Sequence, residues 1–202
     1  AWLLLVMNSM NWLDGLDGLS GGVAAVTLAT IFFLSLKPEV NQPPIAILSA
    51  IGMGATLGFL LFNAYPARIV AGTAGSMFLG FLITALSVVA GTKIATALLV
   101  LALPVADALW VIGERFRAGV SVFRADERHL HYRLRKLGWS EGRIAATFFS
   151  VTLAIAPIAL FTRSVGKLIA FAAVSAAIFS FLFLVGRKVK RLEIGNHEAR
   201  SV

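Results

Sequence analysis

The feature that most constrains this chain is a series of apolar blocks, each about as long as a bilayer is thick. A membrane-spanning helix needs about 20 mostly apolar residues, and six such blocks follow one another between turn-forming or charged residues. They lie at 19–36, 44–63, 75–91, 93–113, 143–162 and 166–186. The sequence therefore predicts an all-α fold, a polytopic transmembrane helical bundle of about six full spans that forms a single membrane domain.

Composition agrees with a membrane protein and excludes several other classes. Hydrophobic residues make up 58% of the 202 positions and charged residues only 14%, whereas a soluble domain has roughly a quarter charged residues. The absence of cysteine excludes a disulfide framework and a thiolate metal site. Residues 1–7 have no basic segment and no cleavage site, so they are not a signal peptide. We expect them to be the end of a seventh helix in a chain truncated at its N-terminus.

The basic residues are distributed unequally between the two ends of the spans. Alternation places residues 8–18, 64–74, 114–142 and the tail 187–202 on one side, and residues 37–43, 91–93 and 163–167 on the other. The first side carries all the Lys and Arg residues except Lys37, Lys93, Arg163 and Lys167. Since cytoplasmic loops carry an excess of Lys and Arg, the first side and the C-terminus are predicted to be cytoplasmic. The net charge of +8 then needs no nucleic-acid partner, and the basic tail is expected to touch anionic headgroups.

The first polar segment on this side contains two Asp-Gly pairs at the start of a predicted span. Asp14 and Asp17 are three residues apart, so on a helical turn they project from the same face. Two carboxylates at a membrane surface can ligate Mg²⁺, or one can act as a base. The alternative is that Asp17 or Ser20 only caps the following helix.

The second polar segment covers residues 62–76 and ends at the start of another predicted helix. Free backbone N–H groups and the positive end of the helix dipole favour a phosphate there, and Ser76 is expected to cap the helix. The alternative is an ordinary turn between two helices.

The third polar segment covers residues 113–134 and places two histidines among several arginines. His129 and His131 with Arg128 and Arg133 form a cationic patch suited to a diphosphate. A zinc site on the His-x-His pair is held as a minor alternative, because no thiolate or third histidine lies nearby. An ordinary positively charged loop would explain the arginines but not the histidines.

Asp107 is the only acidic residue within a predicted span. Acids within the membrane are costly and usually mark a site, so Asp107 is expected on the floor of a water-filled cleft below the loops. A purely structural pair with Arg115 is the alternative.

In this order and on one membrane face, the three segments resemble the polyprenyl-phosphate N-acetylhexosamine-1-phosphate transferases, the family that includes phospho-N-acetylmuramoyl-pentapeptide transferase. The resemblance covers nearly the whole chain. It rests on Asn8-x-x-Asn11-x-x-Asp14-Gly15-x-Asp17-Gly18-Leu19, on Phe62-Asn63-x-x-Pro66-Ala67-Arg68, and on Arg115-x-x-x-Gly119-x-Ser121-x-Phe123-x-x-Asp126-x-x-His129-x-His131-x-Arg133-Leu134.

The resemblance implies transfer of a sugar phosphate, N-acetylglucosamine-1-phosphate being favoured, from a UDP-N-acetylhexosamine to undecaprenyl phosphate, with release of UMP. It implies Mg²⁺ or Mn²⁺ as cofactor, a bacterial inner membrane location and a role in cell-envelope polysaccharide synthesis, such as lipopolysaccharide or teichoic acid. A homodimer is left open. The implied catalytic residues are Asp14, Asp17, His129 and His131, of which Asp14 and Asp17 would also hold the metal. The implied substrate-binding residues are Asn11, Asn63, Arg68, Gly72, Ser76, Asp107, Arg128 and Arg133.

The chain departs from the family pattern at several positions. Thr73 stands where the family has an acidic metal ligand, and Val70 replaces an aromatic residue that can stack on uracil. Val122 stands in place of a proline, Tyr132 follows His131, and a further Asp-rich motif is expected ahead of residue 1. These departures favour a second hypothesis, a catalytically impaired relative that still binds a lipid phosphate or a nucleotide sugar. A transporter is disfavoured, because the polar residues gather at one rim rather than at the bilayer midplane.

Overall fold

The computed structural model describes residues 1–89, 94–121, 127–162 and 164–200, without the side chains of residues 164 and 193–200. All regular secondary structure in these ranges is helical, which confirms the predicted fold class. The helices are α1 Trp2–Leu13, α2 Leu19–Ser35, α3 Pro43–Asn63, α4 Gly72–Val89, α5 Ile94–Val100, α6 Ala102–Arg117, α7 Leu130–Lys136, α8 Glu141–Phe161 and α9 Ser164–Arg200.

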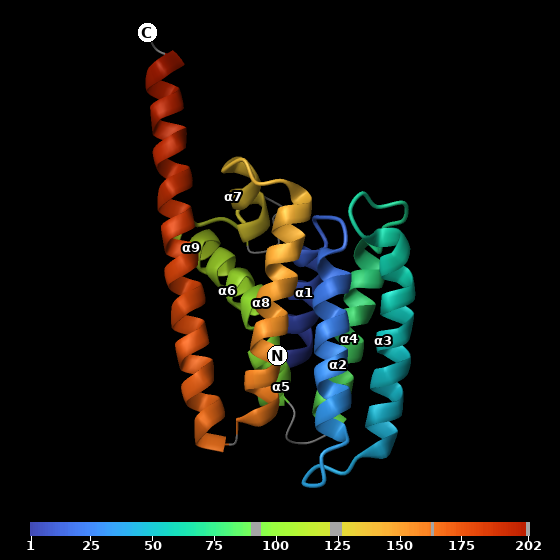
Figure 1. Cartoon of the computed structure of the whole chain (residues 1–202). Helices are drawn as coiled ribbons and strands as arrows, with labels where there is room; N and C mark the ends of the chain where they lie inside the picture. The colour runs from blue at the N-terminus through green and yellow to red at the C-terminus, as the bar shows by residue number, and fades with distance from the viewer. Residues whose placement is uncertain (90–93, 122–126, 163, 201–202) are drawn as a thin grey trace.

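The long helices lie side by side, and their connections gather at two ends of the bundle (Figure 1). The turn between α1 and α2, the loop between α3 and α4, and α7 lie at one end, as the predicted alternation requires. The connections from α2 to α3 and from α8 to α9 lie at the other end. The predicted tight connection at residues 91–93 and the basic residue Arg163 lie outside the described residues.

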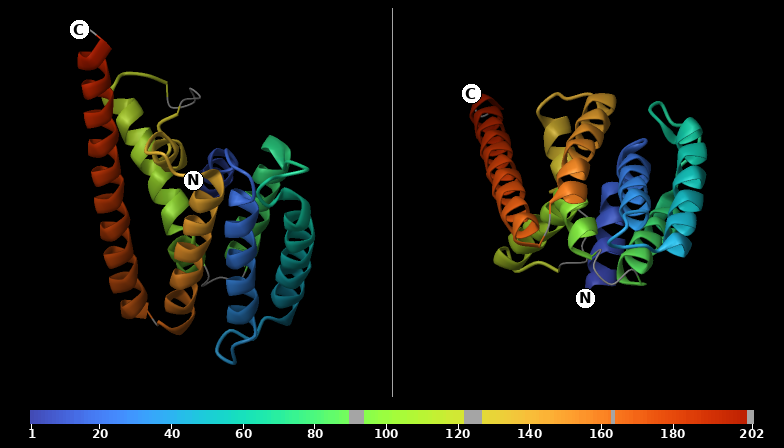
Figure 2. Two further views of the ribbon diagram at one scale, coloured as in Figure 1. Left: turned by 45° about the horizontal axis from the view of Figure 1, so that its top comes forward. Right: turned by 60° about the horizontal axis from the view of Figure 1, so that its bottom comes forward.

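Helix α2 is the centre of the bundle and packs most extensively against α3 and α8. Of its 17 residues, 14 are buried, so nearly its whole circumference faces protein (Figure 2). Small residues allow this close packing. A Cβ atom added at Gly21 would lie 2.9 Å from Leu60 Cδ2, and one at Gly22 would lie 3.5 Å from Phe149.

The predicted number of full spans, about six, was too high. Four helices in the described ranges are long and apolar enough to cross a membrane, namely α3, α4, α8 and the 165–192 part of α9, and the bent pair of α5 and α6 would be a fifth. The block at 19–36 forms α2, which has only 17 residues. At 1.5 Å per residue it is about 26 Å long, shorter than the hydrocarbon layer of roughly 30 Å.

The predicted straight span at 93–113 is broken. Helices α5 and α6 meet at Leu101 with a bend of 78°. Pro104 explains the break, because it has no N–H to donate to Val100 and its ring displaces the carbonyl group four residues earlier. Beyond the bend, α6 continues past the predicted boundary to Arg117.

Three predicted loops are partly helical. Helix α1 continues to Leu13, so the predicted loop 8–18 is reduced to residues 14–18. The predicted loop 114–142 contains α7, and α9 continues through most of the predicted tail 187–202, to Arg200. These segments are polar, as predicted, but the prediction that they are loops was wrong where a polar segment forms a helix.

The close packing of α1 against α4 provides a test of the fold. A Cβ atom at Gly80 of α4 would lie 2.7 Å from the Cα atom of Met7 in α1. We expect Gly80→Ala to push the two helices apart and to lower the free energy of unfolding by about 1–3 kcal/mol, measured by thermal or denaturant unfolding in detergent micelles. The matched control is Gly54→Ala on α3, where an added Cβ meets nothing within 4 Å. Equal stability of the two variants would contradict the described packing.

Candidate functional site

Asp14 joins the first two predicted segments. It follows the last residue of α1, in the turn formed by residues 14–18, and its carboxylate accepts hydrogen bonds from the Ser20 hydroxyl and from the backbone N–H of Gly72 at the start of α4. Burial raises the pKa of Asp14 above its ordinary value of 3.8, and these two hydrogen bonds partly oppose the rise. Asp14 is thus a half-buried acid at the positive end of a membrane helix.

Asp17 and Asn63 hold the same turn against the second segment. Oδ2 of Asp17 accepts a hydrogen bond from the backbone N–H of Ala67 at 2.9 Å, and Oδ1 of Asn63 accepts one from Gly18 at 3.2 Å. The Asn63 side chain also donates to the carbonyl of Ile69 at 2.9 Å. The alternative in which Asp17 or Ser20 caps α2 is wrong, because the N-cap is Gly18, in the left-handed conformation and without a side-chain cap.

Asn11 and Ser76 form a second bridge beneath this surface. The buried Ser76 hydroxyl lies 3.1 Å from Oδ1 of Asn11 on α1 and 2.8 Å from the carbonyl oxygen of Gly72. Ser76 does not cap α4, because that helix already begins at Gly72 and the hydroxyl bonds back to the preceding turn. Gly72 and Arg68 are both exposed on the loop above it.

The third segment is fixed to the membrane helices by Asp107. Oδ2 of Asp107 lies 2.9 Å from Nδ1 of His129, and Oδ1 accepts the backbone N–H of Leu130 at 2.8 Å. Asp107 therefore lies below the histidine segment, but with only 4% of its surface exposed it does not line the predicted water-filled cleft. Its described ion pair is with His129 and not with the alternative partner Arg115.

His131 packs directly against the Asp14 turn. Its ring stacks on that of His129 with a centroid distance of 5.9 Å and an interplanar angle of 9°. A Cβ atom at Gly15 would lie 2.5 Å from Nε2 of His131 and 3.0 Å from the Tyr132 hydroxyl. Within the described residues, both ring nitrogens of the fully buried His131 lack a hydrogen-bond partner. Burial lowers the pKa of His131 to about 4, with Asp107 opposing this shift, so His131 is neutral at pH 7.

Two residues of this cluster were not among the predicted site residues. The ring of Trp12 lies 5.4 Å from that of His129. The guanidinium of Arg115 lies 5.6 Å from the Trp12 ring, and Arg115 is itself buried. Trp12 therefore joins α1 to the histidine segment and to α6. A signal for it was present, because an aromatic residue between Asn11 and Asp14 is unusual in a polar motif.

Arg133 binds within the protein. Its guanidinium donates to the carboxylate of Glu114 on α6 and to the backbone carbonyl of Arg128 at 2.5 Å. A Cβ atom at Gly186 of α9 would lie 2.8 Å from Nη1 of Arg133. Arg133 thus connects α7 to α6 and α9, and its contact with substrate stays a prediction. The motif residues Val122, Phe123 and Asp126 lie outside the described residues.

The described residues offer oxygen ligands but no complete metal cage. No group of three or more His, Asp or Glu side chains in the described ranges could hold a metal ion, so the zinc alternative at the histidines finds no support. Mg²⁺ is usually held by one or two carboxylates together with substrate phosphates and water. Asp14 and Asp17 fit that chemistry, whereas Thr73, exposed at the start of α4, offers only a neutral hydroxyl.

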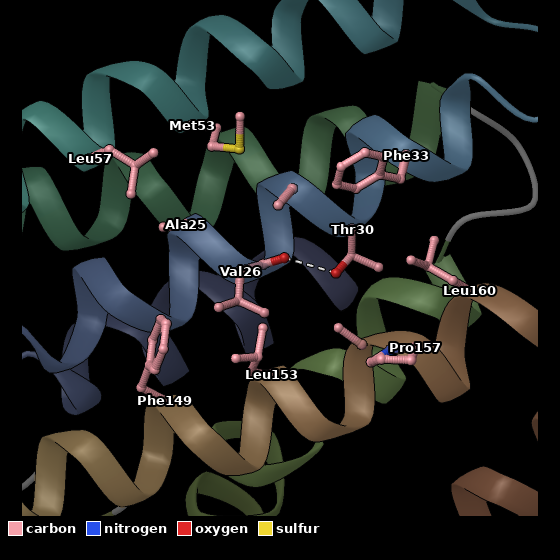
Figure 3. A pocket seen from close by; sticks show the side chains of 12 residues that line it. Ala25, Val26, Thr30, Phe33, Met53, Leu57, Phe149, Leu153, Pro157 and Leu160 are labelled. Carbon is pink, nitrogen blue, oxygen red and sulfur yellow. Dashed lines mark hydrogen bonds between the residues drawn. The ribbon is translucent and has the colours of Figure 1, made fainter.

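Two cavities are lined mainly by apolar side chains, and the larger of them reaches the second polar segment at Val70, Ala71 and Gly75. One, of about 350 Å³, lies between α2, α3 and α8, and its polar side chain Thr30 donates to the carbonyl of Val26 (Figure 3). The other, of about 450 Å³, lies between α3 and α4, and its Thr56 donates to the carbonyl of Gly52. Neither cavity offers charged side chains for a diphosphate, because both are lined by apolar residues and one threonine each.

The pKa of His131 predicts how stability depends on pH. An unfolded histidine titrates near 6.5 and the folded one near 4, so between these values the unfolded chain binds more protons. The contribution of neutral His131 to stability is therefore fully present above pH 6.5 and is lost as the pH drops toward 4. We expect the free energy of unfolding to fall by on the order of 2 kcal/mol between pH 7 and pH 5, measured by unfolding in detergent. His131→Asn should lack this part of the pH dependence, and identical pH slopes for the two proteins would contradict the burial of a neutral His131.

Comparison with known proteins identifies relatives of the chain. Residues 1–91 match the sequence profile of glycosyl transferase family 4. The phospho-N-acetylmuramoyl-pentapeptide-transferase of Anoxybacillus flavithermus is 36% identical over 172 residues, which cover 80% of this chain and 51% of the relative. That of Geobacillus thermodenitrificans is 39% identical over 76% of this chain and 47% of the relative. The decaprenyl-phosphate N-acetylglucosaminephosphotransferase of Mycobacterium tuberculosis is 35% identical over 71% of this chain and 41% of the relative. The chain thus spans about half the length of the curated relatives it matches.

Proposed function

Because residues 1–91 match glycosyl transferase family 4, we propose that this chain is the part of a phosphosugar transferase that carries the catalytic acids and the histidine loop. The substrates are a UDP-N-acetylhexosamine and a polyprenyl phosphate, undecaprenyl phosphate in particular. A phosphate oxygen of the lipid forms a bond to the β-phosphorus of the nucleotide sugar. The bond from that phosphorus to the bridging oxygen breaks, and UMP leaves.

The observation that carries this proposal is the convergence of three separate polar segments on the Asp14 turn. Gly72, the first residue of α4, donates its backbone N–H to Asp14, and His131 packs on Gly15 from α7. A reaction between two phosphates needs acids and hydrogen-bond donors at one place. In this chain, residues that are over a hundred positions apart in sequence supply them.

Asp14 and Asp17 are proposed to hold the magnesium ion, which when bound screens the negative charge of the diphosphate. Asp14 also lies at the N-terminus of α4, where the helix dipole favours an anion. Asn11, Asn63 and the exposed loop residues Arg68 and Gly72 are proposed to face the nucleotide. The histidine segment with Arg128 is proposed to face the diphosphate or the sugar.

The sugar is proposed to be N-acetylglucosamine rather than the pentapeptide-bearing sugar. The basis is the sequence His129-Leu130-His131, because the pentapeptide branch resembles this chain but is expected to carry three successive histidines. Relatives named for either substrate match at similar identity, so the proposal on the sugar rests on this motif alone. The proposed location is the bacterial inner membrane, with the site facing the cytoplasm, where nucleotide sugars are made.

An impaired relative that binds these ligands without turnover is the second candidate. It is favoured by the exposed Thr73 in place of an acid and by Val70, whose side chain is 75% exposed and cannot stack on a base as an aromatic ring does. Activity measurements separate the two candidates.

The first test uses membranes that contain the protein expressed from its complete reading frame, with undecaprenyl phosphate, Mg²⁺ and radiolabelled UDP-N-acetylglucosamine. We expect label in the lipid phase together with UMP release, and we expect Asp14→Asn to lower the rate by about 100-fold or more, as loss of a catalytic acid or base does. The control is Glu39→Gln, an exposed acid at the opposite end of the bundle, which should keep the wild-type rate. Absence of labelled lipid, with retained UDP-sugar binding, would establish the impaired relative instead.

A second test addresses the metal. Thr73→Asp should raise Mg²⁺-dependent transfer and lower the Mg²⁺ concentration needed for half-maximal rate, because a carboxylate binds Mg²⁺ more strongly than a hydroxyl does. The matched variant Thr73→Asn adds a similar volume without charge and should not have this effect. A robust wild-type rate that Thr73→Asp leaves unchanged would mean that another carboxylate supplies the ligand.

A further inference from the structure

Asp107 has both of its carboxylate oxygens engaged by the histidine segment. Asp107 lies on α6, past the 78° bend, and its side chain is almost completely buried. One oxygen accepts the backbone N–H of Leu130 at 2.8 Å, and the other lies 2.9 Å from Nδ1 of His129. His129 and Leu130, the N-cap and first residue of α7, are therefore both bonded to Asp107.

The pair also determines which nitrogen of His129 carries a proton. When Asp107 is ionised, its oxygens only accept hydrogen bonds, and Nδ1 of His129 is then the atom that carries the hydrogen. Nε2 of His129 is buried and has no hydrogen-bond partner in the described residues. The ring is thereby held in one tautomer and one orientation, as an acid does for the histidine that it orients in other active sites.

From His129, the contact continues to the turn that carries the catalytic acid. The His129 ring stacks on that of His131, and Nε2 of His131 lies 2.5 Å from the place that a Cβ atom of residue 15 would take. Gly15 is bonded directly to Asp14. A shift of His129 would therefore move His131 against the backbone next to Asp14, since no gap separates them.

We propose that Asp107 is a positioning residue, which from within the membrane holds His129 and His131 against the Asp14 turn. It does not touch substrate, since its oxygens are occupied and it is sealed from solvent. The proposal rests on the proposed function in one respect, namely that the turn it positions is catalytic.

Three variants separate this role from ordinary support of the fold. Asp107→Asn keeps an oxygen for the Leu130 N–H but presents an amide to His129, which must then change tautomer or lose the contact. Asp107→Leu removes both bonds. His129→Phe keeps the ring and its stacking but removes Nδ1. The matched control is Thr84→Val on α4, a buried polar residue whose hydroxyl donates only to the carbonyl of Gly80 in its own helix.

In the transferase assay, we expect Asp107→Asn to lower kcat by about 10-fold or more, in the range found for groups that orient a functional histidine, with an unchanged KM for the UDP-sugar. In the His129→Phe background, the same change should lower kcat by less than 2-fold, because its target is absent. Thr84→Val should keep the wild-type kcat. If the effects of Asp107→Asn and His129→Phe simply multiply, Asp107 does not act through His129 and the proposal is overturned.

Hydrogen exchange followed by mass spectrometry tests the positioning without any activity. Asp107→Leu should speed exchange in the peptide that contains Leu130 and also in the peptide that covers residues 9–18, whereas Thr84→Val should change neither. Unchanged exchange at residues 9–18 would overturn the claim that Asp107 holds the Asp14 turn through His129 and His131. If the wild-type protein is inactive, the proposed function fails, and the exchange result alone then decides whether Asp107 holds the turn.

Discussion

The site depends on side chains that accept backbone N–H groups from other segments of the chain. Loops between membrane helices cannot bond their own backbone as a helix does, and an unpaired N–H near an apolar phase is costly. Here polar side chains provide the missing acceptors. The pairs of acceptor and donor are Asp14 with Gly72, Asp17 with Ala67, Asn63 with Gly18, and Asp107 with Leu130. Polar side chains that the chemistry requires are therefore also the ones that give the loops a fixed shape.

The break between α5 and α6 at Leu101 brings an acid of the apolar block into contact with the histidine segment. In a straight helix, Asp107 would lie among hydrophobic neighbours with no loop above it. The bend of 78° turns α6 so that Asp107 lies under the entrance to α7. Farther along the same helix, Glu114 binds Arg133 and also the indole N–H of Trp110 at 2.8 Å. Two acids of one helix thus hold α7 at its start and at its middle residue.

Much of the architecture could be predicted from the sequence, because apolar blocks and basic loops follow directly from bilayer thickness and lipid charge. The helical membrane fold is confirmed, and residues 1–91 and the relatives found match the family predicted from the three motifs. The bend at Leu101 was missed because hydropathy counts Pro104 as just another residue of the block. The helix within the third loop was missed because its polarity hides the buried Leu130 and Leu134, which pack into the core.

For the site, the motifs identified which residues gather but not what they bind. Three-residue spacing placed Asp14 and Asp17 on one face of a helix, yet α1 ends before them, and the two carboxylates accept from backbone N–H groups five residues apart in the segment between α3 and α4. Likewise, Asp107 was recognised from its depth alone, whereas its partner depends on where α7 begins. Such pairings are set by tertiary contacts across more than 20 residues, which spacing rules for single helices do not describe.

The contact between Gly15 and His131 has a consequence for how this protein can diverge. A Cβ atom at position 15 would overlap the imidazole of His131, because it would lie 2.5 Å from Nε2. A lineage that acquires even an alanine at position 15 must first shorten or displace the residue at position 131, and a lineage that keeps the histidine must keep the glycine. The two positions, 116 residues apart in the chain, therefore change in a fixed order, in which position 15 can gain a side chain only after the residue at position 131 has made room for it.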